Sequence, residues 1–142
     1  MFSETVIDRD LVQAFRETEY RVHSEQPFTL RVDEVSPGLL GLYRQRRVGS
    51  SAFITACNPY SSCVDAAENQ ARQEELAQEL TTRGLAFIGG IGQHPSNNWP
   101  GEMSFLALGL DLEAAKALGK RFEQNAIVWA DADGVPRLIL LR

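Results

Sequence analysis

Residues 52–57 form an almost unbroken apolar run, Ala-Phe-Ile-Thr-Ala-Cys, near the middle of a chain of 142 residues. A short continuous apolar run is typical of a central strand that is covered on both faces. We therefore expect a sheet with helices packed on it. The chain length predicts one domain over residues 1–142, which buries about two-thirds of the surface that its unfolded chain exposes.

Two pairs of strand-like runs lie on either side of this central run. Residues 20–23 and 28–32 alternate between apolar and polar side chains, which is typical of a hairpin with one buried and one wet face. Residues 126–130 and 137–141 predict a second hairpin around an Asp-Ala-Asp-Gly turn.

Capping residues predict the helices. The expected helices begin after Asp8 or Asp10, at Ser36-Pro37, near residue 64 and at Asp111, and the last three end at Gly49, Gly84 and about Glu123. With the strands, they predict an α/β or α+β domain in which about four helices pack on a single mixed sheet of about six strands.

Charge and cysteine content exclude several classes of protein. The formal net charge is −5, and no segment is a basic arm, which disfavours generic nucleic-acid binding. Two cysteines cannot make a disulfide-rich scaffold. The chain has neither an apolar run long enough to span a bilayer nor the start of a signal peptide, which predicts a cytoplasmic protein. An acidic domain of this kind suits a small ligand or a basic protein partner.

The longest predicted helix carries polar side chains on the face that meets the core. Helical spacing traced back from Leu80 and Leu76 reaches Arg72 and Asn69. If that end is buried, both groups need hydrogen-bond partners, because an unpaired buried polar group costs about 1–3 kcal/mol. Glu102 and the Asn58 amide are the expected partners. If the helix start overhangs the sheet instead, these side chains are solvated.

The turn after the central strand, Asn58-Pro-Tyr-Ser61-Ser, lies where α/β folds often place ligand sites. Asp65 and Glu68 at the following helix start cap it internally and repel an anion, which argues against a phosphate site. Gln124 and Asn125 follow the last helix. An Asn at this position is typical of a left-handed helix cap, and Asn125 directly precedes the next predicted strand.

A short apolar run at residues 85–88 leads into a glycine-rich segment at residues 89–101, before a strand candidate at 103–110. The segment fails the dinucleotide-binding and P-loop patterns, so we expect an irregular loop of thirteen residues that acts as a lid or cleft wall, anchored by Trp99. His94 within it is either a solvated loop histidine or an acid or base.

Cysteine chemistry and metal binding receive little support from the sequence. Cys63 lies near a helix start, which lowers a thiol pKa, but Asp65 opposes that effect and no base is evident. The chain has no Cys-x-x-Cys pair and no closely spaced histidines. We therefore predict neither a metal nor a cofactor.

Four short motifs resemble a bacterial family, domain of unknown function 3293, from about Leu11 to Leu140. They are Ile-Thr-Ala-Cys-Asn-Pro at 54–59, Asn69 with Arg72, Trp-Pro-Gly-Glu-Met-Ser-Phe at 99–105, and Gln-Asn-Ala-Ile-Val-Trp at 124–129. Met103 stands where the family pattern implies a second acid. The resemblance implies a fold-sized unit and no known reaction.

Three hypotheses about function follow. The first is a small-ligand binding module, anionic ligands included, with a polar cleft around Arg72. Its candidate ligand-binding residues are Asn58, Ser61, Asn69, Arg72, Trp99, Glu102, Gln124 and Asn125. The second is an acidic protein-interaction module of the inhibitor or immunity type, which an exposed aromatic or apolar patch would favour. The third is an enzyme that uses Cys63 or His94.

Overall fold

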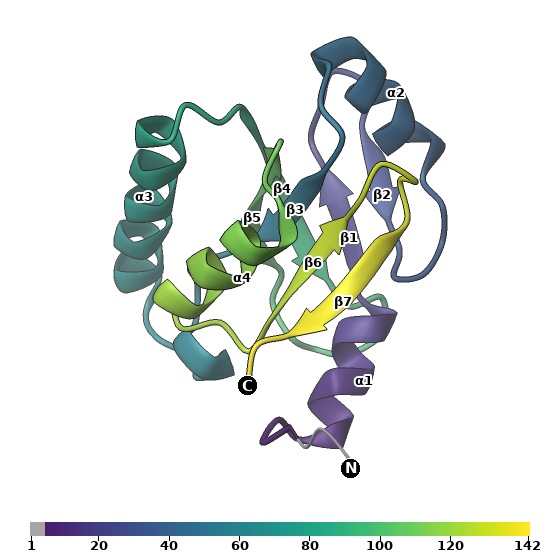
Figure 1. Cartoon of the computed structure of the whole chain (residues 1–142). Helices are drawn as coiled ribbons and strands as arrows, with labels where there is room; N and C mark the ends of the chain where they lie inside the picture. Colours follow the sequence, from purple (N-terminus) through teal and green to yellow (C-terminus); the bar gives the residue numbers. More distant parts are fainter. Residues whose placement is uncertain (1–4) are drawn as a thin grey trace.

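Four α-helices and seven strands make up residues 5–142, the part of the chain that the computed structural model describes (Figure 1). In chain order they are α1 (Arg9–Glu17), β1 (Glu19–Val22), β2 (Phe28–Leu30), α2 (Pro37–Arg46), β3 (Ser51–Ile54), a 3-10 turn η1 (Pro59–Ser61), α3 (Ala66–Thr82), β4 (Phe87–Gln93), β5 (Glu102–Leu108), α4 (Leu112–Arg121), β6 (Ala126–Ala130) and β7 (Pro136–Leu140). The first four residues, part of the segment judged for a signal peptide, lie outside this description.

All seven strands join one sheet in the order β2-β1-β4-β5-β3-β6-β7, and every neighbouring pair is antiparallel. The fold is therefore α+β. The prediction of a mixed sheet is wrong, and the sheet has one strand more than about six. The sheet has no parallel pair because β1-β2, β4-β5 and β6-β7 are hairpins. The remaining pairs, β1-β4, β3-β5 and β3-β6, are antiparallel as well.

The sheet is curled, so that its two ends approach each other. The segment after β2 hydrogen-bonds to the first residue of β7 and to the turn before it. Asp33 N donates to Pro136 O at 2.7 Å, and Ser36 N donates to Gly134 O at 2.9 Å. These bonds satisfy backbone groups that an edge strand would otherwise expose to solvent.

The side chains of β3 alternate between two hydrophobic clusters. Ala52 and Ile54 pack on one face with Leu76 of α3 and Leu118 of α4, and both helices lie on that side in Figure 1. Phe53 packs on the other face, in a cluster that includes side chains of α2. The prediction that β3 is covered on both faces is confirmed, since all four of its residues are buried.

The predicted helix starts are confirmed by their caps. The N-cap residues are Asp8, Ser36, Asp65 and Asp111, and each side chain accepts a hydrogen bond from a backbone N–H of the first turn. The predicted end of the second helix at Gly49 is wrong, because Arg47 adopts the left-handed conformation at the C-cap and its N–H bonds to Tyr43 O.

The glycine-rich segment is also shorter as a loop than expected. Residues 89–93 belong to β4, which leaves residues 94–101 as the connection to β5. Gly90 explains the glycine in this strand: a Cβ there would collide with the Arg21 carbonyl oxygen and would lie 3.0 Å from the Phe53 ring. Glycine thus allows close approach of β1 to β4 rather than an irregular loop.

No helix among residues 5–142 has both the length and the apolar character needed to cross a bilayer.

Candidate functional site

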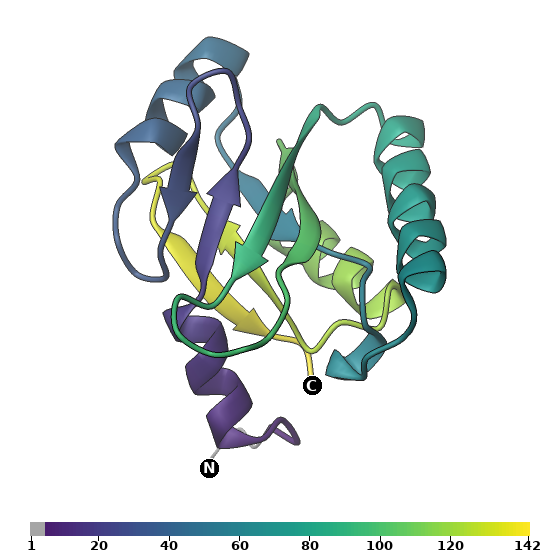
Figure 2. The ribbon, with the colours of Figure 1, turned by 180° about the vertical axis from the view of Figure 1, so that it is seen from behind.

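The predicted site residues gather at one end of the sheet, where β3 ends and β5 and β6 begin. Figure 2 shows the segment after β3 and the 94–101 loop at this end. The segment has an unusual backbone: Asn58, Tyr60 and Ser61 have φ values of 51°, 50° and 63°. Such positive φ values are uncommon outside glycine and persist only where surrounding contacts hold them.

Asn58 is the centre of a hydrogen-bond network that includes two other predicted residues. Its backbone N–H donates to Asn69 Oδ1 at 2.8 Å, and its Oδ1 accepts from Asn69 Nδ2 at 3.0 Å. Its Nδ2 donates to Glu102 Oε2 at 2.8 Å, and its Oδ1 also accepts from Val64 N. Asn58 therefore joins β3, the start of α3 and the start of β5.

Arg72 is half-buried and bonds to backbone carbonyls on two elements. Its Nε donates to Ala56 O at 2.6 Å and its Nη2 donates to Phe122 O at 2.7 Å. Its Nη1 lies 3.5 Å from Glu123 Oε1. The expected pairing of Arg72 with Glu102 is wrong, because the guanidinium turns toward the end of α4 instead of toward β5.

Gln124 and Asn125 complete the network from the other side. Gln124 is buried, and its Nε2 donates to Cys57 O at 3.1 Å. Asn125 is also buried; its Nδ2 donates to Ser61 Oγ at 2.9 Å, and its Oδ1 accepts from Arg142 Nη1 at 3.1 Å. Both side chains therefore hold the turn against the start of β6.

The left-handed cap predicted at Asn125 lies two residues earlier. Glu123 has φ 59°, and Gln124 N donates to Gly119 O at 3.0 Å, which ends α4. The carbonyl of Glu123 accepts from Tyr60 N at 2.6 Å. This bond explains the position of Glu123, since it joins the end of α4 to the strained turn.

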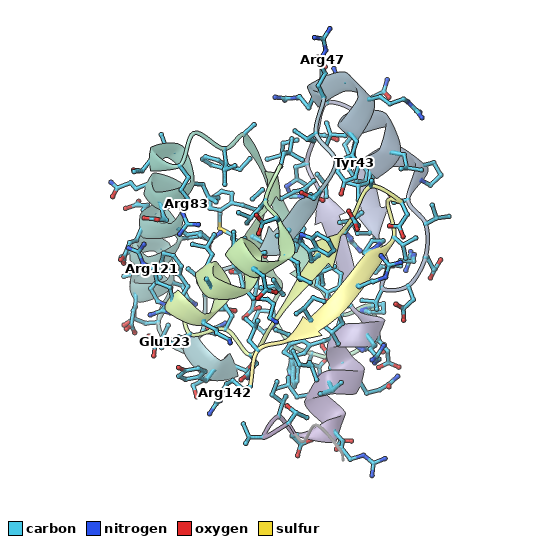
Figure 3. The ribbon with its side chains drawn as sticks, in the orientation of Figure 1. Tyr43, Arg47, Arg83, Arg121, Glu123 and Arg142 are labelled. Carbon is cyan, nitrogen blue, oxygen red and sulfur yellow. The ribbon has the colours of Figure 1, made fainter. Side chains whose placement is uncertain are left out.

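Sequence reasoning missed Arg142, Glu123 and Gln73. The Arg142 guanidinium lies 4.2 Å from the centroid of the Tyr60 ring, and Figure 3 shows Arg142 and Glu123 at the same end of the molecule. No sequence pattern indicates these long-range contacts. Gln73, in contrast, shares the buried face of α3 with Leu76 and Leu80, and that spacing could have identified it.

Gln73 leaves one hydrogen-bonding group unused. The residue is 6% exposed, and its Oε1 accepts from Ala56 N at 2.9 Å. Its Nε2 is the one buried side-chain nitrogen or oxygen without a partner among residues 5–142. The contact between α3 and the end of β3 therefore retains an unused donor.

Glu102 is a half-buried carboxyl group with little compensation for its charge. Burial raises its pKa, while the hydrogen bond from Asn58 acts in the opposite direction. Within the described residues, no arginine, lysine or histidine lies at ion-pair distance from it. The carboxyl group therefore has spare capacity to accept hydrogen bonds or to pair with a cation.

Trp99 lies outside the hydrogen-bond network, although it was predicted to line the same cleft. Trp99 is 54% exposed, and its backbone N–H donates to Asn97 Oδ1 at 3.0 Å. Met103, next to Glu102 on β5, is 67% exposed. The sheet end thus combines a polar network with the exposed Trp99 on the loop before β5, whereas Met103 projects from the face of β5 opposite to Glu102.

The two residues of the predicted enzyme alternative, Cys63 and His94, have different surroundings. Cys63 is exposed, whereas Cys57 is buried and burial raises the pKa of its thiol. Both ring nitrogens of His94 contact groups of α1 or of its own loop. Across residues 5–142, no three His, Cys, Asp or Glu side chains are placed to bind a metal ion together.

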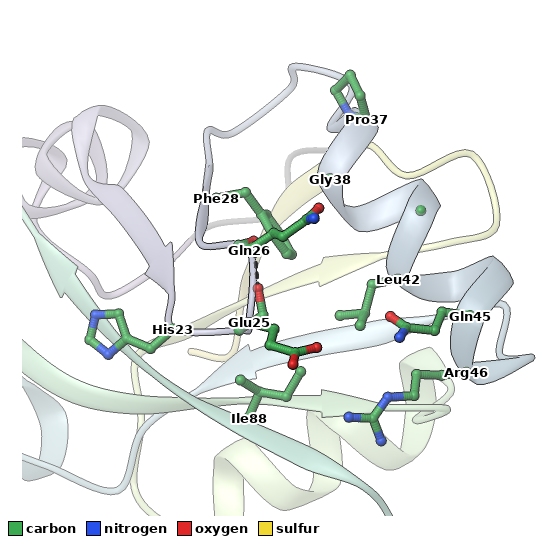
Figure 4. Close-up of a pocket in the computed structure, with 12 residues that line it drawn as sticks. His23, Glu25, Gln26, Phe28, Pro37, Gly38, Leu42, Gln45, Arg46 and Ile88 are labelled. Atoms are coloured by element: carbon green, nitrogen blue, oxygen red, sulfur yellow. Dashed lines mark hydrogen bonds between the residues drawn. The ribbon is translucent and has the colours of Figure 1, made fainter.

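An open groove lies elsewhere, between the β1-β2 turn and α2 (Figure 4), with a volume of about 1020 Å³. Phe28, Leu42 and Ile88 are its larger apolar side chains, with His23 and Arg46 among its polar ones. None of the eight predicted site residues lines it.

Comparisons with known proteins distinguish the sheet end that holds the predicted site residues from the groove beside α2. No curated protein and no solved structure matches the chain. A family model described as a protein of unknown function, DUF3293, matches residues 54–127, just over half of the chain. The matched region contains all eight predicted site residues, whereas Ile88 is the one groove residue within it. The chain belongs to the DUF3293 family of proteins of unknown function.

Proposed function

We propose that this protein is a binding module whose ligand presents a positive charge or a hydrogen-bond donor to Glu102 at the end of the sheet. The observation that carries the proposal is the half-buried Glu102 carboxyl, which accepts from Asn58 and has no cation beside it among residues 5–142. A bound cation would compensate the cost of removing this carboxylate from water.

The exposed aromatic side chain near Glu102 in the chain fits the same ligand chemistry. Trp99 precedes Glu102 by three residues and is more than half exposed. A tryptophan face attracts a cation with about 0.5–2 kcal/mol, whereas Met103, next to Glu102 on β5, projects from the opposite face of the strand. A ligand with an amine or guanidinium group and an apolar body therefore suits this surface.

Arg72 supports the walls of the site more than it supports an anionic ligand. Two of its nitrogens donate to Ala56 O and Phe122 O, and the third faces Glu123. An anion at Arg72 would have to replace these bonds. We therefore assign Arg72 a structural role within the binding module.

The exposure of Trp99 also favours a second candidate, a protein partner that inserts a basic side chain at Glu102. Tryptophan is enriched among the residues that dominate the binding energy of protein interfaces, and the net charge of −5 favours a basic partner. The two candidates share one chemistry and differ in what carries the cation.

The test is a titration of the protein with cations and matched anions. The melting temperature and the amide NMR spectrum are measured at each ligand concentration. The small probes are agmatine and choline, with phosphate and citrate as anions; an arginine-rich peptide represents a protein partner. We expect a cation to raise the melting temperature, because a ligand that binds only the folded state stabilises it, and to shift the amide signals of Trp99 and residues 101–104.

Two variants make this test specific. Glu102→Gln keeps an acceptor for Asn58 but removes the charge, so the effect of the cation should disappear. Glu34→Gln removes one charge from an exposed residue away from the network and should leave the effect unchanged. Binding of the peptide with no response to agmatine or choline favours the protein partner. Stabilisation by the anions alone, or an unchanged response of Glu102→Gln, contradicts the proposal.

A further inference from the structure

His94 is the first residue of the loop at residues 94–101, and its side chain makes hydrogen bonds within this loop. Its Nδ1 accepts hydrogen bonds from two backbone N–H groups, those of Ser96 and Asn97, each at 3.1 Å. Its Nε2 lies 3.1 Å from Glu17 Oε1 on α1, and its side chain is 10% exposed. The imidazole of His94 therefore joins the backbone of its own loop to α1.

These contacts determine which ring nitrogen holds the proton. A backbone N–H can only donate, so Nδ1 must present its lone pair to Ser96 and Asn97. In the neutral ring the proton then lies on Nε2, where it is directed at the Glu17 carboxylate. The loop conformation requires the neutral ring in this one tautomer.

The loop that His94 organises leads directly to the proposed binding site. Asn97, whose N–H bonds to the ring, accepts the Trp99 N–H through its own side chain. Gly101 then lies against Ile91 of β4: a Cβ there would lie 2.6 Å from the Ile91 side chain. The position of Trp99 relative to Glu102 therefore depends on the hydrogen bonds at His94.

We propose that His94 is a pH-sensitive positioning residue: the neutral ring holds the loop at residues 94–101, and protonation at Nδ1 releases it. Protonation puts a third N–H where two backbone N–H groups already point, so both hydrogen bonds are lost. The ring keeps its bond to Glu17 and the new Nδ1–H turns to water. Only the consequence for ligand binding rests on the proposed function; the effect on the loop does not.

Groups around the His94 ring favour either its protonated or its neutral form. The hydrogen bond from His94 lowers the pKa of Glu17, with a smaller effect of Gln13 in the same direction, so Glu17 is a carboxylate that favours the protonated ring. The carboxyl of Glu19, at the start of β1, is held by Arg21 and Arg31. The two backbone donors at Nδ1 favour the neutral ring, in opposition to Glu17.

The experiment is a pH titration of the free protein, with ¹⁵N shifts of the imidazole and amide exchange of Ser96 and Asn97. At neutral pH we expect the Nε2–H tautomer and protected amides. As the ring becomes protonated, the protection factors of both amides, which compare each exchange rate with the intrinsic rate at the same pH, should fall about tenfold or more, as expected for the loss of one hydrogen bond each. Both changes should share one midpoint.

Three variants separate this effect from a general loss of structure. His94→Gln offers an acceptor that does not titrate, so the loop should stay ordered and the midpoint should disappear. Glu17→Gln removes the charge that favours the imidazolium, so the midpoint should move to lower pH. His23→Gln changes the other histidine of the chain and should have no effect.

A neutral ring in the Nδ1–H form overturns the proposal, as does a titration of His94 that leaves the Ser96 and Asn97 amides unchanged. Since no ligand is present, these results do not depend on the proposed function. Failure of agmatine, choline and the arginine-rich peptide all to bind while the loop is ordered contradicts the proposed function and leaves the role of His94 intact.

Discussion

Replacing Arg72 by methionine tests whether this residue holds the sheet end together. Methionine keeps an apolar side chain of similar length and removes every N–H donor. Ala56 O then loses its bond at 2.6 Å and Phe122 O loses its bond at 2.7 Å. The contact with Glu123 is long, at 3.5 Å, and adds little.

The expected loss follows from these two bonds. A hydrogen bond that involves a charged group contributes about 1.5–3 kcal/mol. The Phe122 carbonyl keeps a second donor, Gln124 Nε2 at 3.2 Å, so its loss lies at the lower end of that range. We therefore expect Arg72→Met to reduce the free energy of unfolding by about 3 kcal/mol, out of about 5–15 kcal/mol for a typical domain.

Urea unfolding followed by circular dichroism measures this difference, and the melting temperature should fall by about 6–12 °C. Arg72→Lys should recover less than half of the loss, because one ammonium group cannot reach both carbonyls as a guanidinium does. Arg83→Met, which removes an ion pair with Glu79 on the same helix, is the matched control and should lose much less. A loss below about 1 kcal/mol for Arg72→Met would refute the structural role derived from these bonds.

Three further predictions concern single positions. Glu102→Gln should stabilise the protein at neutral pH: burial raises the pKa of Glu102, so its favourable contribution is present at low pH and is lost as pH rises through that pKa; urea unfolding at acidic and neutral pH measures this, and destabilisation at neutral pH contradicts it. Gly90→Ala should destabilise by about 1–3 kcal/mol or more, whereas Gly89→Ala, with nothing within 4 Å of its Cβ, should not; melting temperatures compare the two. Under native conditions a thiol reagent should label Cys63 at once and the buried Cys57 only after unfolding; equal rates would contradict this.

Local chemistry made most elements of the fold predictable. The side chains of Asp8, Ser36 and Asp111 satisfy the N–H groups of the helix that follows each of them, so the sequence around each cap is sufficient. Hairpins are equally local, since both strands and the turn are adjacent in the chain. The direction in which β3 pairs is different, because its partners, β5 and β6, are decided by the packing of the whole sheet.

The partners of the predicted site residues could be anticipated mainly where side chains bond to side chains. Asn58, Asn69 and Glu102 do so, and helical spacing together with the turn placed them near one another. Arg72 instead bonds to backbone carbonyls, which every residue possesses, so no sequence pattern distinguishes its partners. Gly90 was misread because a glycine required by close strand packing has the same letter as a glycine in a loop.

The position of β3 also constrains how the chain folds. Three of the six strand pairings, β1-β2, β4-β5 and β6-β7, join neighbours in the chain and can form early as hairpins. β3 alone has no such partner, and it must insert between two hairpins that are already made, at a high cost in loop-closure entropy. Its amides should therefore exchange only through global unfolding, and substitutions in β3 should slow folding more than substitutions of equal cost in any hairpin.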